Sequence, residues 1–562
     1  MRRRNFLKNI TKASLAPLLL NGIPVQQLMG QSALKELAAQ STNDRVLVLI
    51  QLHGGNDGLN TLVPLNQYDI YHRLRSNIAL PQKGSRSVIS LDNTLPESQM
   101  IGLHPDIRAL KELYEQGKTA IVQGVGYDNM NGSHFRSRDI WFMGGNYDQT
   151  FNSGWTGRYL SELYPDYPDK YPSMAMPDPL ALELGSRVSL AFHREDGIPT
   201  AVALEDPDQF YRLSEGGGAP AEVSPNGSYY DEELSYIAGI EDKGDDYAQR
   251  LYKVFSKGKN VVAYPGKYSL NAPYYKAKNH LSSQLKTVAR LMSGGCQTRV
   301  YLARLGGFDT HALQVEQSDS SMGEHAALLH NLFEAIKAFQ NDLKALELED
   351  KVMTVTFSEF GRRATSNGSL GTDHGTTAPM FVFGKHVNAG VIGENPDLSN
   401  LTPDNNLRKQ HDYRQVFGTL LADWMGATNS AIEAARLERF TRRDQILPII
   451  NKIPSGSSPS PAPEPSPAPA PEPEKELPHQ VNKLFPNPAY DEITLEYYMA
   501  SRVPHRIVIL NANGVEMDVI NRKGWDYGFK KAAFRLDQYK SGNYMCVLEI
   551  GSDRIVKHFI KK

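Results

Sequence analysis

A stretch made almost entirely of proline, alanine, serine and glutamate limits what this chain can fold into more than any other feature. Between Ser455 and Pro478 the sequence reads SGSSPSPAPEPSPAPAPEPEKELP. Such a composition cannot bury an apolar core, and its prolines favour extended polyproline II geometry. The chain must therefore fold on either side of a spacer. We predict four parts: a leader (1–42), a large domain (43–453), the spacer (454–480) and a small domain (481–562).

The charge and the apolar residues of the chain exclude two classes of partner. The 562 residues carry 61 basic and 63 acidic side chains, for a net charge of −2, so no field would gather nucleic acid. The longest apolar run of the leader, Ala13 to Leu20, is much shorter than the roughly 20 residues of a membrane-spanning helix. Cys296 and Cys546 are the only cysteines, so no disulfide framework is expected. We predict neither nucleic-acid binding nor a transmembrane segment.

The leader begins with an arginine pair followed by an apolar stretch. Arg3 to Lys8 reads RRNFLK and resembles the twin-arginine export signal, which a translocase reads on proteins that have already folded. The resemblance implies that the twin-arginine translocase is a partner. Folding before export would also allow a metal ion to be loaded inside the cell.

The large domain alternates strand and helix patterns. Continuous apolar runs of this length are typical of strands buried on both faces of a sheet, and the segments between them have helical spacing. We predict an α/β domain, a doubly wound sheet with helices on both faces. The expected strands are 46–52, 119–123, 300–305, 352–357 and 380–383, the expected helices are 105–116 and 328–346, and 216–230 is expected to be a surface insertion.

Five polar clusters adjoin these strands, where sites form in open α/β sheets. Carboxylates and imidazoles gathered at one sheet edge suit Zn²⁺, Mn²⁺ or Mg²⁺, and a hydroxyl beside such an ion becomes a nucleophile. This pattern predicts a divalent-metal hydrolase. The clusters are His53 to Gly58 (HGGNDG), Asn129 to Phe135 (NMNGSHF), Gly307 to His311 (GFDTH), Ser358 to Arg362 (SEFGR) and Gly371 to Gly375 (GTDHG).

Each cluster taken alone has a simpler interpretation. Asp57 fits a turn residue in Asn-Asp-Gly, and Ser133 fits the N-cap of the helix that follows it. Asp309 and His311 fit a hydrogen-bonding pair, and Glu359 with Arg362 fits an ordinary salt bridge. The metal hypothesis depends on the clusters occurring together at successive strand ends.

The five clusters also resemble the bacterial family named domain of unknown function 1501, and they follow in the same order over almost the whole large domain. That family is similar to the alkaline phosphatase and sulfatase superfamily, which implies an alkaline-phosphatase-like sheet with one or two metal ions and an anionic ester substrate. The implied nucleophile is Ser133, with Asp57 as a metal ligand bridging toward it. The implied ligands of one metal position are Asp309, His311 and His374, and those of the other are Glu359 and Asp373.

Two departures from the superfamily pattern make one metal site the safer expectation. Glu359-Phe360 stands where an Asp-His pair is usual, and one residue separates Asp309 from His311 where three are common. By strand alignment, His53 instead of Asp57 is an alternative first ligand. The residues expected to bring positive charge to the ester are His134, Arg136 and Arg362.

The small domain contains short strand patterns and the turn signal Asn513-Gly514, which predict a β-sandwich. Expected strands are 493–497, 506–510, 515–520, 543–550 and 554–560. Its opening Leu484 to Pro488 (LFPNP), its centre and its basic end resemble the type A carboxy-terminal sorting domain of the type IX (Por) secretion system of Bacteroidetes-like bacteria. The resemblance implies the type IX secretion machinery as a partner and a final location at the cell surface or in the medium.

Taken together, the sequence predicts an exported, metal-dependent hydrolase of phosphate or sulfate esters. The alternative is a surface-displayed binding or structural protein that keeps the scaffold without catalysis, and the missing imidazole at Phe360 favours it. A third possibility is an enzyme that modifies surface polysaccharide.

Overall fold

The computed structural model describes residues 19–20, 23–24, 44–205, 246–270, 272–451, 479–499, 503–512, 514–523, 528–551 and 553–562. The predicted insertion, nearly all of the predicted leader and most of the predicted spacer lie outside these residues. The chain divides into two compact units, residues 1–454 and 455–562, and each is described by itself.

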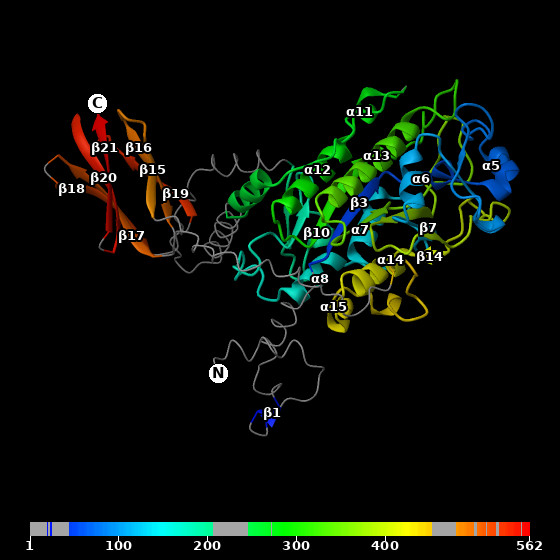
Figure 1. Ribbon diagram of the computed structural model, residues 1–562, viewed down its shortest axis with the longest axis horizontal. Helices are drawn as coiled ribbons and strands as arrows, with labels where there is room; N and C mark the ends of the chain where they lie inside the picture. Colours follow the sequence, from blue (N-terminus) through cyan, green and yellow to red (C-terminus); the bar gives the residue numbers. More distant parts are fainter. Residues whose placement is uncertain are drawn as a thin grey trace, which may run out of the picture. The chain divides into compact units, whose positions relative to one another are not determined.

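A nine-stranded sheet forms the centre of the first unit (Figure 1). All five predicted strands are confirmed in it. In spatial order it contains β13 (Gly390–Ile392), β7 (Thr119–Gly126), β12 (Ala378–Phe383), β11 (Val352–Phe357), β3 (Val46–His53), β10 (Val300–Gly306), β8 (Ala181–Glu183) and β9 (Ala201–Ala203), and β14 (His411–Asp412) pairs with β7.

The sheet is mixed, because a single strand runs against the others. β3 pairs in parallel with β10 and β11, whereas β12 is antiparallel to both of its neighbours, β11 and β7. The carboxyl ends of the parallel strands and the beginning of β12 therefore lie at the same edge. The residues that follow β3, β7, β10 and β11 can meet there with those that precede β12.

Helices cover both faces of the sheet, as the apolar strands require. Along β3, Leu47 and Leu49 belong to one buried cluster, and Val48 and Ile50 belong to another. Figure 1 shows α6, α12 and α13 on one side of the strands and α8, α14 and α15 on the other. The helices are α6 (Arg108–Glu115), α7 (His134–Met143), α8 (Trp155–Leu163), α12 (His280–Ser293), α13 (Glu324–Ala345), α14 (Tyr413–Thr419) and α15 (Asn429–Ala434).

Shorter elements surround this core. Residues 246–257 are helical, and a three-stranded antiparallel sheet packs beside the large one. The remaining elements are β1 (Leu19–Leu20), β2 (Ile23–Pro24), α4 (Gly58–Thr61), β4 (Leu62–Pro64), η1 (Leu65–Gln67), α5 (Tyr68–Leu74), β5 (Ile89–Ser90), η2 (Glu97–Gln99), β6 (Ile101–Leu103), η3 (Leu190–Phe192), α11 (Tyr274–Ala277), the π-helix η4 (Leu420–Trp424) and η5 (Glu438–Phe440).

The second unit is the predicted β-sandwich, with two antiparallel sheets around a core of its own. The five predicted strands are confirmed, and β15 and β19 were missed. Asn513 of the predicted turn lies outside the described residues, but the strands on either side of it, β17 and β18, pair as an antiparallel hairpin. The sheets are β15 (Gln480–Phe485), β16 (Glu492–Met499) and β19 (Gly528–Arg535), and β18 (Glu516–Lys523), β17 (Pro504–Asn511), β20 (Gly542–Ile550) and β21 (Asp553–Lys561).

Among the described residues, no helix combines the length and the apolar character needed to cross a bilayer. Cys296 and Cys546 are both buried and free, and burial raises the pKa of their thiols to about 11 and about 12.

Candidate metal centre

Side chains from five separate segments converge at the carboxyl edge of the large sheet. Three of them, His134, Asp309 and His374, each place one nitrogen or oxygen atom so that all three atoms lie within 4.8 Å of one another. His134 is the first residue of α7, Asp309 follows β10, and His374 precedes the reversed strand β12. The reversal of β12 is what brings His374 to this edge. We call this group the histidine cluster.

The imidazoles of the histidine cluster face the two oxygens of Asp309. Nε2 of His374 lies 3.3 Å from Oδ1 of Asp309, and Nε2 of His134 lies 3.4 Å from Oδ2. The ring centroids of the two histidines are 4.4 Å apart. Nε2 of His134 is buried and has no hydrogen-bond partner among the described residues.

The other ring nitrogen of each histidine is held by a group that accepts hydrogen bonds. Nδ1 of His374 lies 2.7 Å from the carbonyl oxygen of Gly132, and Nδ1 of His134 lies 2.9 Å from Oε1 of Glu359. Both Nδ1 atoms therefore carry a hydrogen, so in the neutral rings the Nε2 lone pairs point at the carboxylate of Asp309. A cation has to lie between these atoms for the contact to be favourable, either a second ring proton or a metal ion.

Glu359 is a buried carboxylate that holds the ring of His134 in position. Its side chain is fully buried, and Oε1 accepts from the backbone N–H of Gly54 at 2.7 Å and lies 3.3 Å from Nδ1 of His53. Burial alone would raise the pKa of Glu359, but hydrogen bonds from His134 and His53 outweigh it and lower that pKa to about 2. Oε2 is buried without a hydrogen-bond partner in the described part of the chain. Glu359 is thus an ionised carboxylate that orients His134 and retains an unused acceptor.

Arg362 holds Asp309 in its ionised form. The buried guanidinium donates to Oδ1 of Asp309 at 2.7 Å and to the carbonyls of Gly54, Gly55, Phe308 and Thr372. Burial would raise the pKa of Asp309, but the hydrogen bond and charge of Arg362, together with His374 and His311, keep it well below its usual range. These contacts occupy the guanidinium of Arg362, which ties loops together instead of facing solvent.

Two further side chains border the histidine cluster. Nδ1 of His311 lies 2.8 Å from Oδ1 of Asp309, and its ring is about half exposed. Phe360 is buried, with its ring centroid 4.9 Å from that of His134 and 4.5 Å from that of His374. The residue that stands where an imidazole is usual therefore forms an apolar wall of the site.

Close backbone approach at Gly54 allows the loops to meet. Gly54 has φ +121°, and a Cβ added there would lie 2.2 Å from the backbone nitrogen of Asp309. Any larger residue would push the loop after β3 away from the loop after β10.

The structure places Asp57 among protein donors and not in the histidine cluster. Its carboxylate is 1% exposed and pairs with the guanidinium of Arg75 at 2.8 Å. It also accepts from Gln314 at 2.6 Å and caps α4 through the backbone N–H of Leu59 at 3.2 Å. Protein donors occupy both oxygens, so Asp57 is not brought into the histidine cluster. His53, the alternative first ligand, does reach the site through Glu359.

Asp373, Ser133 and Arg136 also make contacts outside the cluster. Asp373 lies 3.1 Å from Asn367 and 3.9 Å from Arg363. Ser133 is the N-cap of α7, where its exposed hydroxyl accepts from the backbone of Arg136 at 3.5 Å. The guanidinium of Arg136 donates to the carbonyls of Tyr147 and Gln149. The sequence offered the capping interpretation of Ser133 but no signal for the direction of Arg136.

Comparison with known proteins finds two families. Residues 273–428 match the family described as "Protein of unknown function (DUF1501)", and residues 483–562 match the "Secretion system C-terminal sorting domain". The first match contains Asp309, Glu359 and His374 but not His134. No curated protein sequence matches the chain.

Several solved structures are similar to the chain, at low sequence identity and low TM-score. Ps i-CgsB in complex with k-i-k-neocarrahexaose is 11% identical, with 92% of this chain and 85% of that chain covered and a TM-score of 0.32. An alkaline phosphatase superfamily protein from Vibrio parahaemolyticus is 9% identical, with 63% and 64% covered and a TM-score of 0.29. The sulfatase PsFucS1 from Pseudoalteromonas sp. is 12% identical, with 92% and 88% covered and a TM-score of 0.31.

The sorting domain indicates that the protein is exported by type IX secretion machinery and reaches the cell surface or the medium. Residues 273–428 are thus similar to the DUF1501 family, and residues 483–562 are similar to secretion-system C-terminal sorting domains.

Proposed function

We propose that this protein is a metal-dependent hydrolase of phosphate or sulfate esters that acts after export. The observation that carries the proposal is the pair of Nε2 atoms of His134 and His374, which face the carboxylate of Asp309 while both Nδ1 atoms are anchored. Metal-binding histidines in proteins usually donate their other ring N–H to a carbonyl or carboxylate in this way.

The donor atoms fit a divalent cation of intermediate softness. Two imidazole nitrogens and one carboxylate oxygen suit Zn²⁺ or Mn²⁺, whereas Mg²⁺ prefers oxygen ligands alone. A bound ion would supply Lewis-acid polarisation of an ester oxygen and would stabilise negative charge that develops on it.

The protein's own residues would prepare the site for that chemistry. Arg362 keeps Asp309 ionised, Glu359 orients the ring of His134, and Phe360 excludes water from one side. His53 is about half exposed and contacts Glu359, so it can exchange protons between the site and solvent.

Ser133 remains our proposed nucleophile. Ser133 directly precedes His134, and its hydroxyl is exposed. Within the described part of the chain, that hydroxyl makes a single weak hydrogen bond, the cap bond of 3.5 Å. Replacement by alanine is expected to abolish ester turnover and to leave metal content unchanged. If Ser133→Ala hydrolyses esters as fast as wild type, the nucleophile is another group.

The proposal is tested by measuring bound metal and ester turnover in the same preparations. Wild type purified with Zn²⁺ or Mn²⁺ supplied is expected to retain one ion per chain and to hydrolyse an aryl phosphate or an aryl sulfate, whereas His374→Ala should lose both properties. The matched control is His386→Ala, which removes another histidine paired with a carboxylate, Asp350 at 2.9 Å. Wild type without ion above background would refute the proposal.

A second candidate function is a surface-displayed binding or structural protein without catalysis. Two observations favour it: the Ser133 hydroxyl serves as a helix cap, and protein groups occupy the guanidinium of Arg362. Stoichiometric metal without turnover of either ester would support this second function.

A further inference from the structure

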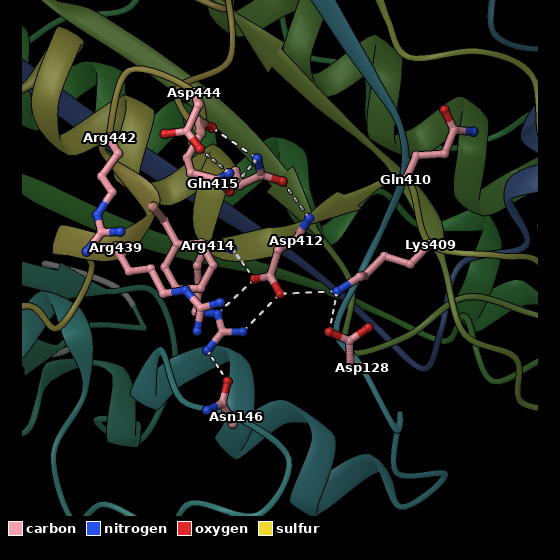
Figure 2. A pocket seen from close by; sticks show the side chains of 12 residues that line it. Asp128, Asn146, Lys409, Gln410, Asp412, Arg414, Gln415, Arg439, Arg442 and Asp444 are labelled. Carbon is pink, nitrogen blue, oxygen red and sulfur yellow. Dashed lines mark hydrogen bonds and ion pairs between the residues drawn. The ribbon is translucent and has the colours of Figure 1, made fainter.

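A polar pocket lies in the same unit and shares no residue with the histidine cluster. Its volume is about 410 Å³, and Figure 2 shows the side chains that line it. They come from the loop after β7, the loop before α8, the segment around β14 and α14, and the segment around η5. The lining residues used below are Asp128, Asn146, Lys409, Asp412, Arg414, Gln415, Arg439, Arg442, Asp444 and Gln445.

The floor of this pocket is a network of paired charges. Arg414 is buried and donates to both oxygens of Asp412, at 2.8 and 2.9 Å, and to Asn146 at 2.5 Å. Lys409 lies 2.7 Å from Asp128 and 3.4 Å from Asp412. This network fixes one guanidinium and one ammonium group in position without spare negative charge.

The rim of the pocket carries two further cations that the network does not neutralise. Arg439 and Arg442 are exposed, and neither side chain makes a hydrogen bond or an ion pair with the described residues. Asp444 is the only other carboxylate of the lining, so four basic side chains face three acidic ones. Figure 2 shows Arg414, Arg439 and Arg442 at one end of the pocket and Lys409 with Asp128 at the other.

Guanidinium groups gathered at one end of a pocket repel one another unless an anion lies among them. Arginine also offers paired donors whose spacing matches the oxygens of phosphate and sulfate groups. We propose that this pocket binds the phosphate or sulfate group of a carbohydrate ester, with Arg439 and Arg442 as the anion-binding residues.

The size and remaining lining of the pocket point to a ligand larger than a free ion. Its volume falls within the range of about 300–1,000 Å³ that is typical of small-molecule sites. The side-chain amides of Asn146, Gln415 and Gln445 lie in the lining. Gln415 accepts from the backbone of Asp412 and donates to Gln445, and Gln445 donates to Asp444. The side-chain nitrogen of Asn146 has no hydrogen-bond partner among the described residues, so it can donate to a hydroxyl group. A hydroxyl group of a sugar would meet the amide of Asn146 while its ester group meets the arginines.

Calorimetric titration of the full chain tests this assignment with four probes: glucose 6-phosphate, glucose 6-sulfate, glucose and inorganic phosphate. We expect at least one of the two esters to bind more tightly than inorganic phosphate, and glucose to bind weakest. The double variant Arg439→Gln/Arg442→Gln is expected to lose at least about tenfold in affinity for that ester. Arg443→Gln is the matched control, because Arg443 is an exposed neighbour that does not line the pocket.

Three results would overturn the proposal. Equal affinity of wild type and the double variant for the ester would show that the two arginines do not bind it. An equal loss of affinity in Arg443→Gln would show that the effect comes from general surface charge. If inorganic phosphate binds as tightly as both esters, the pocket does not recognise the carbohydrate part of the ligand. Under the proposed function, wild type would also hydrolyse these esters at the histidine cluster. His374→Ala separates the two sites, because it should lose turnover there and still bind the ester in this pocket as wild type does.

Discussion

Two carboxylates at the same edge of the sheet, Asp57 and Asp309, have opposite surroundings. Each follows a buried strand, and each pairs with a buried arginine, at 2.8 Å for Arg75 and 2.7 Å for Arg362. Around Asp57 every carboxylate oxygen meets a donor, whereas Asp309 also faces the Nε2 atoms of two imidazoles whose Nδ1 atoms are held by other acceptors. The comparison shows what distinguishes a candidate metal ligand from a structural aspartate at a strand end. The structural aspartate has a protein donor for each oxygen, whereas the candidate ligand faces nitrogen atoms that could share a metal ion with it.

The largest expected effect comes from replacing Asp57, the carboxylate whose oxygens all accept hydrogen bonds from protein donors. Asp57→Ala would leave the fully buried guanidinium of Arg75 without its counter-charge, which costs about 3–5 kcal/mol of unfolding free energy. Urea denaturation of the variant measures this loss. Asp373→Ala, at a half-exposed carboxylate 3.9 Å from Arg363, is the control and should change stability by less than about 1 kcal/mol. Equal stability of the two variants would contradict the contrast.

A second change tests Asp309, the carboxylate that faces the two imidazoles. Asp309→Asn keeps the size of the side chain but removes its charge, so metal affinity should fall by more than about 100-fold, a loss larger than that expected from replacing a residue behind a ligand. Competition with a chelator measures the affinity. Asp373→Asn should bind metal as wild type does, and a similar loss in both variants would place the ligands elsewhere.

Glu359 tests whether the orientation of His134 matters. Glu359→Gln can still accept from Nδ1 of His134 but removes the negative charge behind it, so we expect metal affinity to fall by about 10–100-fold. The same chelator competition applies. Glu349→Gln, at a carboxylate that pairs with Lys118, serves as control. An unchanged affinity in Glu359→Gln would make this glutamate a packing residue only.

The last prediction concerns pH and the surroundings of Asp57. His325 is fully buried, 3.1 Å from Asn56, and burial lowers its pKa to about 4. Below about pH 6.5 the unfolded chain binds a proton that the folded chain does not. Stability should therefore fall between about pH 6.5 and pH 4, by at most about 1.4 kcal/mol per pH unit from this group.

Denaturation of wild type and His325→Asn at several pH values isolates that contribution. The variant should show a shallower dependence on pH within this window, whatever its stability at neutral pH. Identical slopes would show that His325 does not remain neutral in the folded chain.

Much of the fold could be predicted from the sequence, because long apolar runs and helical spacing are local signals. The run Val352 to Phe357 was predicted with its observed bounds, and the strands beginning at Val46 and Thr119 were predicted apart from their last residues. The missed strand β19 contains two lysines and two alanines (GFKKAAFR), so its apolar alternation is weak. The reversed direction of β12 depends on pairing between distant segments and leaves no local signal.

The site was predictable as a set of segments but not as a set of contacts. The clusters around Asp309, Glu359 and His374 converge because strand ends share an edge of the sheet. Which carboxylate an arginine neutralises depends on side-chain direction, so the sequence could not distinguish Asp57 from Asp309. The tautomer of each histidine is likewise set by a distant acceptor, as with Gly132 and His374.

The sandwich has a hydrophobic core built only from residues 481–559, separate from the cores of the α/β unit. Each part can therefore keep its fold when the polypeptide between them is cut. A protease that cuts there after transport would release the α/β unit from the β-sandwich without denaturing it. By the same logic, fusing the β-sandwich to an unrelated protein would direct that protein to the same location without giving it the activity of the α/β unit.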